Sequence, residues 1–101
     1  MQAVKLADMI KYQEASVVSK EILKDSSGTI SLFAFDRGQG LSEHTAPFNV
    51  MVYIMDGEAD IFISGKQFSV KTGEMLIMPA GEPHSIKAGQ RVKMLLVMIK
   101  K

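Results

Sequence analysis

Turn signals recur at short intervals along this chain of 101 residues and leave only short runs between them. Pairs such as Asp56-Gly57 and Ser64-Gly65 are typical of tight turns, because glycine tolerates positive φ angles. Short runs of strand character between closely spaced turns are typical of an all-β sandwich or barrel. We therefore predict an all-β fold. The other turn signals are Asp25–Gly28, Arg37–Gly40, Thr72-Gly73, Ala80–Pro83 and Ala88-Gly89.

The runs between these turns differ in how many faces they bury. Residues 50–55 and 94–99 are apolar throughout, and residues 29–36 are mostly apolar. A continuous apolar run indicates a strand that is covered on both faces, whereas the alternation in residues 67–71 indicates one face in water. A barrel of this size has one interior, so the second face of the apolar strands needs a partner. We therefore expect a homodimer.

The beginning of the chain follows a different pattern. Leu6, Met9 and Ile10 recur at helical spacing, which predicts a helical turn that is too short to be stable alone. We expect residues 1–15 to form a strap or lid over one end of the barrel. The length of the chain predicts one domain, residues 1–101.

Composition excludes several classes of site and partner. The chain has no cysteine, so it has no disulfide, thiolate metal site or cysteine nucleophile. It has no apolar stretch of the roughly 18 residues that span a membrane, and its first residues lack the apolar stretch of a signal peptide. The net charge of +1 argues against nucleic acid. We expect a cytoplasmic protein with neither membrane nor nucleic acid as partner.

Two motifs carry a resemblance to a known superfamily. The later one is Gly-x5-Pro-x-Gly-x2-His, formed by Gly73, Pro79, Gly81 and His84. The proline suits the end of a strand, where no ladder donor is needed. The turn that follows leads His84 into the next strand.

The earlier motif keeps Gly38, His44 and Gly57 at the spacing of the first cupin motif. The two motifs together resemble those of the cupin superfamily, and the resemblance covers residues 30–99. It implies a double-stranded β-helix (jelly roll) barrel. It also implies that His44 and His84 face the interior of the barrel.

The chain departs from the cupin pattern at two ligand positions. A cupin metal site has three histidines and a glutamate, but Ala46 stands at the second histidine position and Val50 at the glutamate position. Only His44 and His84 remain as candidate metal ligands, an incomplete set for catalytic zinc or iron. The cofactor we expect, if there is one, is a weakly bound divalent transition metal. Glu82, in the turn before His84, is interpreted as a solvated residue.

Three interpretations of His44 and His84 stay open. They are hydrogen-bonded histidines of the core or pocket, or they hold a metal completed by water or a small ligand. In the third interpretation they form a metal-free recognition or acid–base pair, because histidine titrates near neutral pH.

The resemblance also implies a pocket at the mouth of the barrel. We expect the ligand pocket to be an apolar cup with two polar groups, the usual profile of a small-molecule site. Phe48 either closes over a ligand or packs under the N-terminal segment. The predicted pocket residues are His44, Phe48, Val50, Val52 and His84.

These residues favour a protein that binds or senses a small molecule through a degenerate two-histidine site. The alternative is a metal-dependent enzyme, dioxygenase-like or isomerase-like, with a reduced ligand set. The sequence leaves open whether the chain is an enzyme, since this scaffold hosts many functions.

Methionine is frequent, with eight residues in the chain. Six of them lie in predicted strands. Their soft thioethers would suit Cu(I) or an adaptable ligand pocket. The spread over several strands favours filling of the core and the dimer contact. The six are Met51, Met55, Met75, Met78, Met94 and Met98.

Overall fold

The structure is a computed structural model that describes residues 2–100. Its elements are a 3-10 turn and nine strands, all between residues 6 and 99. No helix among residues 2–100 is long and apolar enough to cross a membrane. In chain order the elements are η1 (Leu6–Asp8), β1 (Val17–Asp25), β2 (Gly28–Phe35), β3 (Gly40–His44), β4 (Asn49–Asp56), β5 (Glu58–Ile63), β6 (Lys66–Lys71), β7 (Met75–Met78), β8 (His84–Lys87) and β9 (Val92–Ile99).

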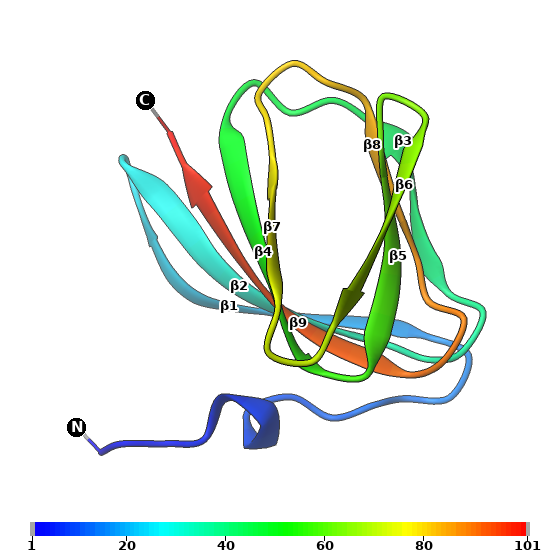
Figure 1. Ribbon diagram of the computed structural model, residues 1–101. Coiled ribbons are helices and arrows are strands. Elements are labelled where there is room, and N and C mark those ends of the chain that lie inside the picture. Colours follow the sequence, from blue (N-terminus) through cyan, green and yellow to red (C-terminus); the bar gives the residue numbers. More distant parts are fainter. Residues whose placement is uncertain (1, 101) are drawn as a thin grey trace.

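The strands form two sheets that face each other and curve into a barrel (Figure 1). One sheet has five strands in the order β1-β2-β9-β4-β7, and the other has four in the order β3-β8-β5-β6. Every pairing is antiparallel. Neighbours such as β2 and β9 are far apart in the sequence, so the chain crosses repeatedly between the sheets. This is the predicted all-β jelly roll, and it is confirmed.

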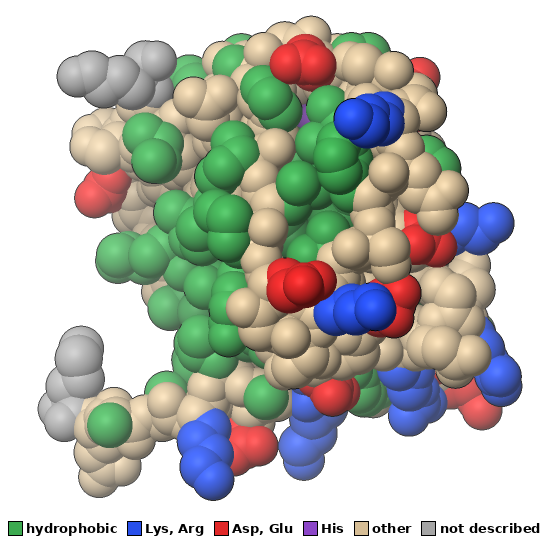
Figure 2. Space-filling model, in the orientation of Figure 1, with side chains coloured by type: hydrophobic (Ala, Val, Ile, Leu, Met, Phe, Trp, Pro, Cys, Tyr) green, Lys and Arg blue, Asp and Glu red, His purple; other side chains and the backbone are tan. Residues whose placement is uncertain are grey.

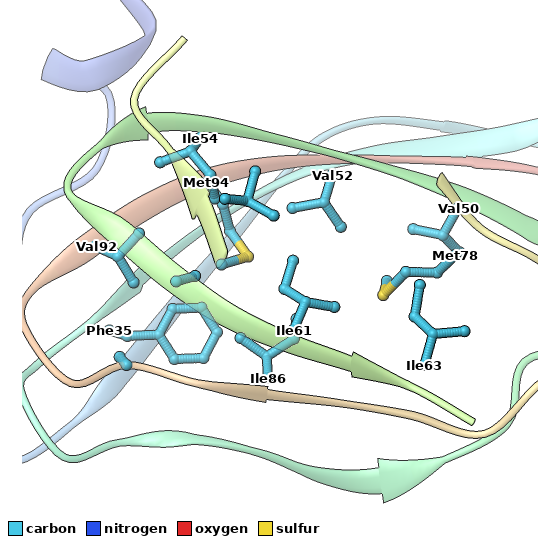
Figure 3. Packing of buried hydrophobic residues seen from close by; sticks show 13 residues of the cluster. Phe35, Val50, Val52, Ile54, Ile61, Ile63, Met78, Ile86, Val92 and Met94 are labelled. Atoms are coloured by element: carbon cyan, nitrogen blue, oxygen red, sulfur yellow. The ribbon is translucent and has the colours of Figure 1, made fainter. Parts of the chain in front are cut away.

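The core lies between the two sheets and follows from strand alternation (Figure 3). In β4 the side chains of Val50, Val52 and Ile54 point inward and are buried, while the residues between them are half-exposed. Strand β5 buries Ile61 and Ile63 in the same way. The strands formed by the apolar runs therefore fill the barrel with their inward side chains. Their outward side chains are also apolar, and no strand of this chain covers them.

The tight turns adopt the conformations that their sequences predict. Ser64 and Gly65 have φ angles of 50° and 81° and join β5 to β6 in a two-residue hairpin, a turn that requires positive φ at both positions. Gly57, with φ of 88°, also lies against the backbone of Arg91. A Cβ at Gly57 would collide with the Arg91 carbonyl, so this position needs glycine for two reasons.

Replacing Gly57 with alanine is expected to lower the free energy of unfolding by about 2–3 kcal/mol, because backbone strain and a steric clash add. Gly65→Ala is the matched control. Gly65 also has positive φ, but a Cβ there would meet nothing within 4 Å. The control should therefore lose only about 1 kcal/mol. Urea denaturation measures the free energy of unfolding of both variants. Equal losses would show that the clash between the new Cβ and the Arg91 carbonyl does not destabilise the fold.

Strand β1 was not predicted from the sequence. Most of its residues are exposed, and it pairs only with β2, with an irregularity between Glu21 and Leu23. Exposed edge strands carry charged side chains that limit unwanted pairing. A search for apolar runs therefore does not detect this strand, because charged residues interrupt its sequence.

The N-terminal segment lies at the end of the barrel where β2 and β4 finish and against the outer face of the five-stranded sheet. The helical turn predicted there is confirmed as a single 3-10 turn, Leu6–Asp8. Ile10 is buried against Leu32 and Ala34 on the outer face. The Tyr12 hydroxyl donates to Asp56 Oδ2 over 2.5 Å. Burial and this hydrogen bond raise the pKa of Tyr12.

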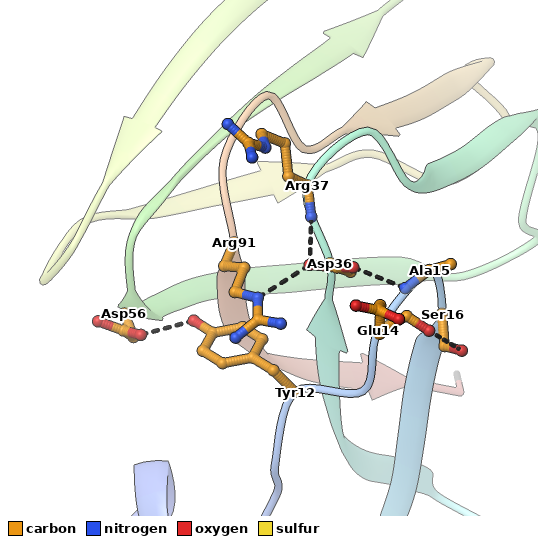
Figure 4. A network of polar contacts seen from close by, with 8 residues as sticks. All are labelled: Tyr12, Glu14, Ala15, Ser16, Asp36, Arg37, Asp56 and Arg91. Carbon is orange, nitrogen blue, oxygen red and sulfur yellow. Dashed lines mark hydrogen bonds and ion pairs between the residues drawn. The ribbon is translucent and has the colours of Figure 1, made fainter.

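Asp36 ties the same segment to the barrel (Figure 4). One carboxylate oxygen accepts the backbone N–H of Ala15 over 2.6 Å, and the other accepts Arg91 Nε over 2.8 Å. The hydrogen bond from Arg91, with those from the backbone N–H groups of Ala15 and Arg37, lowers the pKa of Asp36 from 3.8 to about 2. Asp36 is therefore ionised throughout the neutral range.

The depressed pKa of Asp36 sets an expected pH dependence. Its stabilising effect should be complete above its ordinary pKa of 3.8 and should fall as the pH approaches its folded pKa of about 2. The melting temperature of wild-type protein should exceed that of Asp36→Asn at pH 7, and the gap should close between about pH 4 and pH 2. Thermal melts across this range test it. A difference in melting temperature that does not change with pH would show that the ionised Asp36 carboxylate does not stabilise the fold.

Candidate small-molecule site

A pocket opens between the two sheets at the end of the barrel where β2 begins and β9 ends. Its volume is about 150 Å³. Most of its wall is apolar, formed by Phe33, Leu41, Val50, Met78, Leu96 and Met98 among others. The polar groups in the wall come from His44 and His84 on the four-stranded sheet, and from Thr29 and Ser31 on the other.

The register of the strands brings the two histidines together. His44 ends β3 and His84 begins β8, and they are directly paired in the four-stranded sheet. On its other side, His84 pairs with Ile63 of β5. The sheet irregularity between Leu41 and His44 precedes this pair. Residues that face each other across two strands have side chains on the same side of the sheet, here the interior.

The two imidazoles meet through their Nε2 atoms, which are 3.1 Å apart. The ring centroids are 4.4 Å apart and the planes are inclined by 72°. Each Nδ1 faces a backbone carbonyl oxygen, that of Ser42 at 2.8 Å for His44 and that of Glu82 at 3.3 Å for His84. A carbonyl oxygen only accepts hydrogen bonds, so His44, which has the shorter contact, carries its hydrogen on Nδ1, and its Nε2 accepts a hydrogen bond from the Nε2–H group of His84.

His84 is the buried member of the pair, with 3% of its surface exposed. Burial lowers the pKa of His84, and the nearby charge of His44 lowers it further, while the hydrogen bond to the Glu82 carbonyl opposes both effects. The neutral form of His84 is therefore favoured near neutral pH.

The predicted pocket residues separate into two groups. His44, Val50 and His84 line the cavity. Val52 does not, because it lies one inward-facing position deeper in β4 and is fully buried in the core. Phe48 is half-buried and does not line the cavity, whereas Ala46, two residues before it, does.

From the sequence, Thr29 and Ser31 were not expected in the pocket, and Met78 and Met98 were expected to fill the core or the dimer contact rather than a ligand pocket. Thr29 and Ser31 of β2, Met78 of β7 and Met98 of β9 all line the pocket. Strand alternation was the available signal, since Phe35 is buried and every second residue before it points inward. The N-terminal segment lies at the opposite end of the barrel, so it is not a lid over this pocket.

The residues around the two histidines do not fit a protein-held metal centre. The positions where the cupin resemblance implies a histidine and a glutamate carry Ala46 and Val50, and both line the pocket. No group of three histidine, cysteine or acidic side chains within residues 2–100 is placed to hold a metal ion. The nearby carboxylate of Glu82 accepts a hydrogen bond from the Ser64 hydroxyl over 3.0 Å. Catalytic zinc and iron sites have at least three protein ligands.

Comparison with known sequences finds a relative in Vibrio cholerae. The chain is 42% identical over 64 residues to a Vibrio cholerae protein named "Putative quercetin 2,3-dioxygenase". The match covers 62% of this chain but only 21% of that protein. Most of the Vibrio protein therefore has no counterpart in this comparison.

Solved structures share the fold closely. A conserved protein of unknown function from Streptococcus pyogenes superposes with a TM-score of 0.95 at 30% identity, covering 99% of this chain and 88% of that one. A cupin superfamily protein from Desulfitobacterium hafniense gives a TM-score of 0.94 at 28% identity, covering 99% and 92%. A cupin 2 conserved barrel domain protein from Leptotrichia buccalis gives 0.91 at 35% identity, covering 94% and 46%.

The family model for the AraC-like ligand binding domain matches residues 28–99, which run from β2 to β9. These residues include both histidines and the whole wall of the pocket. The chain is a small cupin, and it belongs to the AraC-like ligand binding domain family.

Proposed function

We propose that this protein binds or senses a small molecule in the pocket between its sheets, and that it does so without a resident metal. The observation that supports this most strongly is the pocket itself. Its wall is mostly apolar, and two imidazoles converge at one side. An apolar cavity with a few convergent polar groups is the usual profile of a small-molecule site.

A thermal-shift screen with a blocked variant tests this proposal. Ala46→Leu adds bulk to the pocket wall, whereas Ala80→Leu adds the same bulk at an exposed turn. A ligand present at about 100 times its Kd should stabilise wild-type protein by about 2.7 kcal/mol. Ala80→Leu should keep this shift and Ala46→Leu should lose it. Hits that stabilise both variants equally would place binding outside the pocket.

A metal-dependent enzyme, dioxygenase-like or isomerase-like, is the second candidate. Two observations favour it: the Nε2 atoms of His44 and His84 converge within 3.1 Å, and the Vibrio relative is named as a dioxygenase. We rank the enzyme second because the pocket wall provides only two candidate metal ligands, His44 and His84.

Adding a histidine at position 46 and a glutamate at position 50 should create the metal site that the cupin resemblance implies. Ala46→His combined with Val50→Glu is expected to bind Mn²⁺ or Fe²⁺ at least about tenfold more tightly than wild-type protein, because each added donor completes the coordination shell. Calorimetric titration measures the metal affinity of wild-type protein and of the double variant. Tight, stoichiometric binding by wild-type protein would support the enzyme instead. Unchanged affinity in the double variant would show that these positions do not face the histidines.

We further propose that a second copy of this chain covers the outer face of the five-stranded sheet. One cross-strand row on that face is apolar in all five strands, as the register shows. Hydrophobic side chains gather on this side of the molecule (Figure 2). Because the row carries no charge, it suits a partner surface that is equally apolar, which the same face of another copy provides. The row is Leu23, Ile30, Val97, Met51 and Ile77.

A further inference from the structure

We infer that the pocket selects uncharged molecules of at most one ring, and that contact with its apolar wall, rather than a bond to either histidine, holds them. This inference rests on the proposed function and narrows it to a class of ligand. It follows from the hydrogen bonds of the two imidazoles, from the side chains of the wall and from the volume of the cavity.

The two imidazoles already bond within the protein. Nδ1 of His44 donates to the Ser42 carbonyl oxygen over 2.8 Å, and its Nε2 accepts the Nε2–H of His84 over 3.1 Å. A ligand that bonded to either Nε2 atom would first have to break the contact between them. Exchanging one hydrogen bond for another changes the net free energy little. The pair therefore contributes ring surface to the wall rather than a vacant polar anchor.

The wall has no charged partner to offer a ligand. No lysine, arginine, aspartate or glutamate among residues 2–100 lines the cavity. Two charged residues of β1 lie beside the wall. Lys24 pairs with Thr29 of β2, and Glu21 pairs with Ser31. Both charged side chains are exposed and they have opposite signs, so they favour neither an anion nor a cation. A charged ligand would enter the cavity without an opposite charge in the wall, at a high desolvation cost.

The volume and the remaining side chains define the neutral ligand. At about 150 Å³, the cavity matches one of similar volume that binds benzene in an engineered protein, whereas a flavonol has three rings. Phe33, Met78 and Met98 provide apolar surface, and thioethers pack well against the edge of an aromatic ring. The hydroxyl groups of Thr29 and Ser31 lie in the same wall. A hydroxyl both donates and accepts, so a small neutral substituent of either kind is tolerated.

Probes that differ in charge but share one ring test the inference. Benzyl alcohol, benzoate and benzylamine are titrated at pH 8, where the last two are an anion and a cation. The methyl signal of Met78 reports binding in the cavity. We expect benzyl alcohol to bind at least about tenfold more tightly than either ion, because the wall does not offset the loss of their hydration. Benzoate or benzylamine binding as tightly as benzyl alcohol would overturn the charge limit.

Toluene and quercetin test the other two parts of the inference. Toluene has no hydrogen-bonding group and should bind within about threefold of benzyl alcohol, since apolar contact supplies most of the affinity. Failure of toluene to bind would show that a polar anchor holds the ligand. Quercetin, with three rings, should bind more weakly than benzyl alcohol. Tighter binding of quercetin in the cavity would overturn the size limit.

A charge placed in the wall should change the preference. Met98 is half-buried and lines the cavity, and lysine has a side chain of similar length. In Met98→Lys the preference for benzyl alcohol over benzoate should fall from at least about tenfold to about twofold or less. Met75→Lys is the matched control, because Met75 is exposed on the outer face, and it should keep the wild-type preference. An unchanged preference in folded Met98→Lys would overturn the inference.

The wild-type ranking of the probes decides the inference even if Met98→Lys does not fold. The thermal-shift screen separates this inference from the proposed function. If the screen finds ligands that Ala46→Leu blocks, but all of them are charged or larger than one ring, this inference fails and the proposed function stands. If Ala46→Leu blocks no compound of the screen and no probe, both fail.

Discussion

Replacing Phe35 with alanine is expected to lower the free energy of unfolding by about 3–5 kcal/mol, the usual cost of removing a buried phenyl ring. Phe35 is the largest fully buried side chain, with 0% of its surface exposed. It packs with Ile61, Ile86 and Val92 between the two sheets (Figure 3). Total stabilities of small domains are about 5–15 kcal/mol, so the loss is a large fraction of the whole.

Phe62→Ala is the matched control for this prediction. Phe62 is the next residue after Ile61 in β5 and points to the outer, half-exposed side of the four-stranded sheet. Its removal leaves no enclosed cavity, so we expect a loss of about 1 kcal/mol or less. Urea denaturation at equilibrium measures both variants. Losses of similar size would mean that the core does not lie between the sheets as described.

Replacing Val97 with aspartate is expected to convert a dimer into a monomer. Val97 lies in β9 at the middle of the apolar row, between Ile30 and Met51. In a two-fold symmetric contact the substitution occurs on both sides. Two unpaired carboxylates at the centre of the contact should cost about 4 kcal/mol together, which weakens dimerisation about a thousandfold.

Sedimentation velocity at micromolar concentration tests this expectation. Wild-type protein should sediment as a dimer and Val97→Asp as a monomer. The control is Gln67→Asp, an exposed residue of β6 in the other sheet, which should remain dimeric. Because the pocket lies inside each barrel, the monomeric variant should keep its ligand affinity. A monomeric wild-type protein would contradict the assignment of this face.

The fold could be predicted because its signals are local. Tight turns at Gly57 and Gly65 and the two histidine motifs identify the barrel and the site within it. Strand β1 could not be found in this way, because it is an edge strand that pairs with β2 alone. Most of its side chains are exposed, so its sequence has no long apolar run. The contacts of Tyr12 with Asp56, 44 residues away, leave no pattern in a single sequence.

The site was predictable in part for the same reason. His44 and His84 belong to recognisable motifs, whereas Thr29 and Ser31 belong to a strand without one. Alternation predicts which side of a strand a residue faces, but it does not predict its depth, so Val52 was placed in the pocket instead of the core. Depth depends on how the two sheets pack.

The sequence left open whether the methionines line a ligand pocket or fill the core, and the structure places them in both. Met78 and Met98 line the pocket, and Met94 is fully buried in the core. Met51 and Met75 instead face outward from the five-stranded sheet. Their positions provide separate reporters for the interior and for the outer face.

Methyl NMR of protein labelled at the methionine ε-carbons therefore tests the central claim, that a small molecule binds inside the barrel beside His44 and His84. The protein is titrated with phenol, toluene, benzoate and cyclohexanol. We predict saturable shifts of the Met78 and Met98 methyl signals and unchanged signals from Met51 and Met75. Shifts confined to Met51 and Met75, or no saturable shift with any of these compounds, would contradict it.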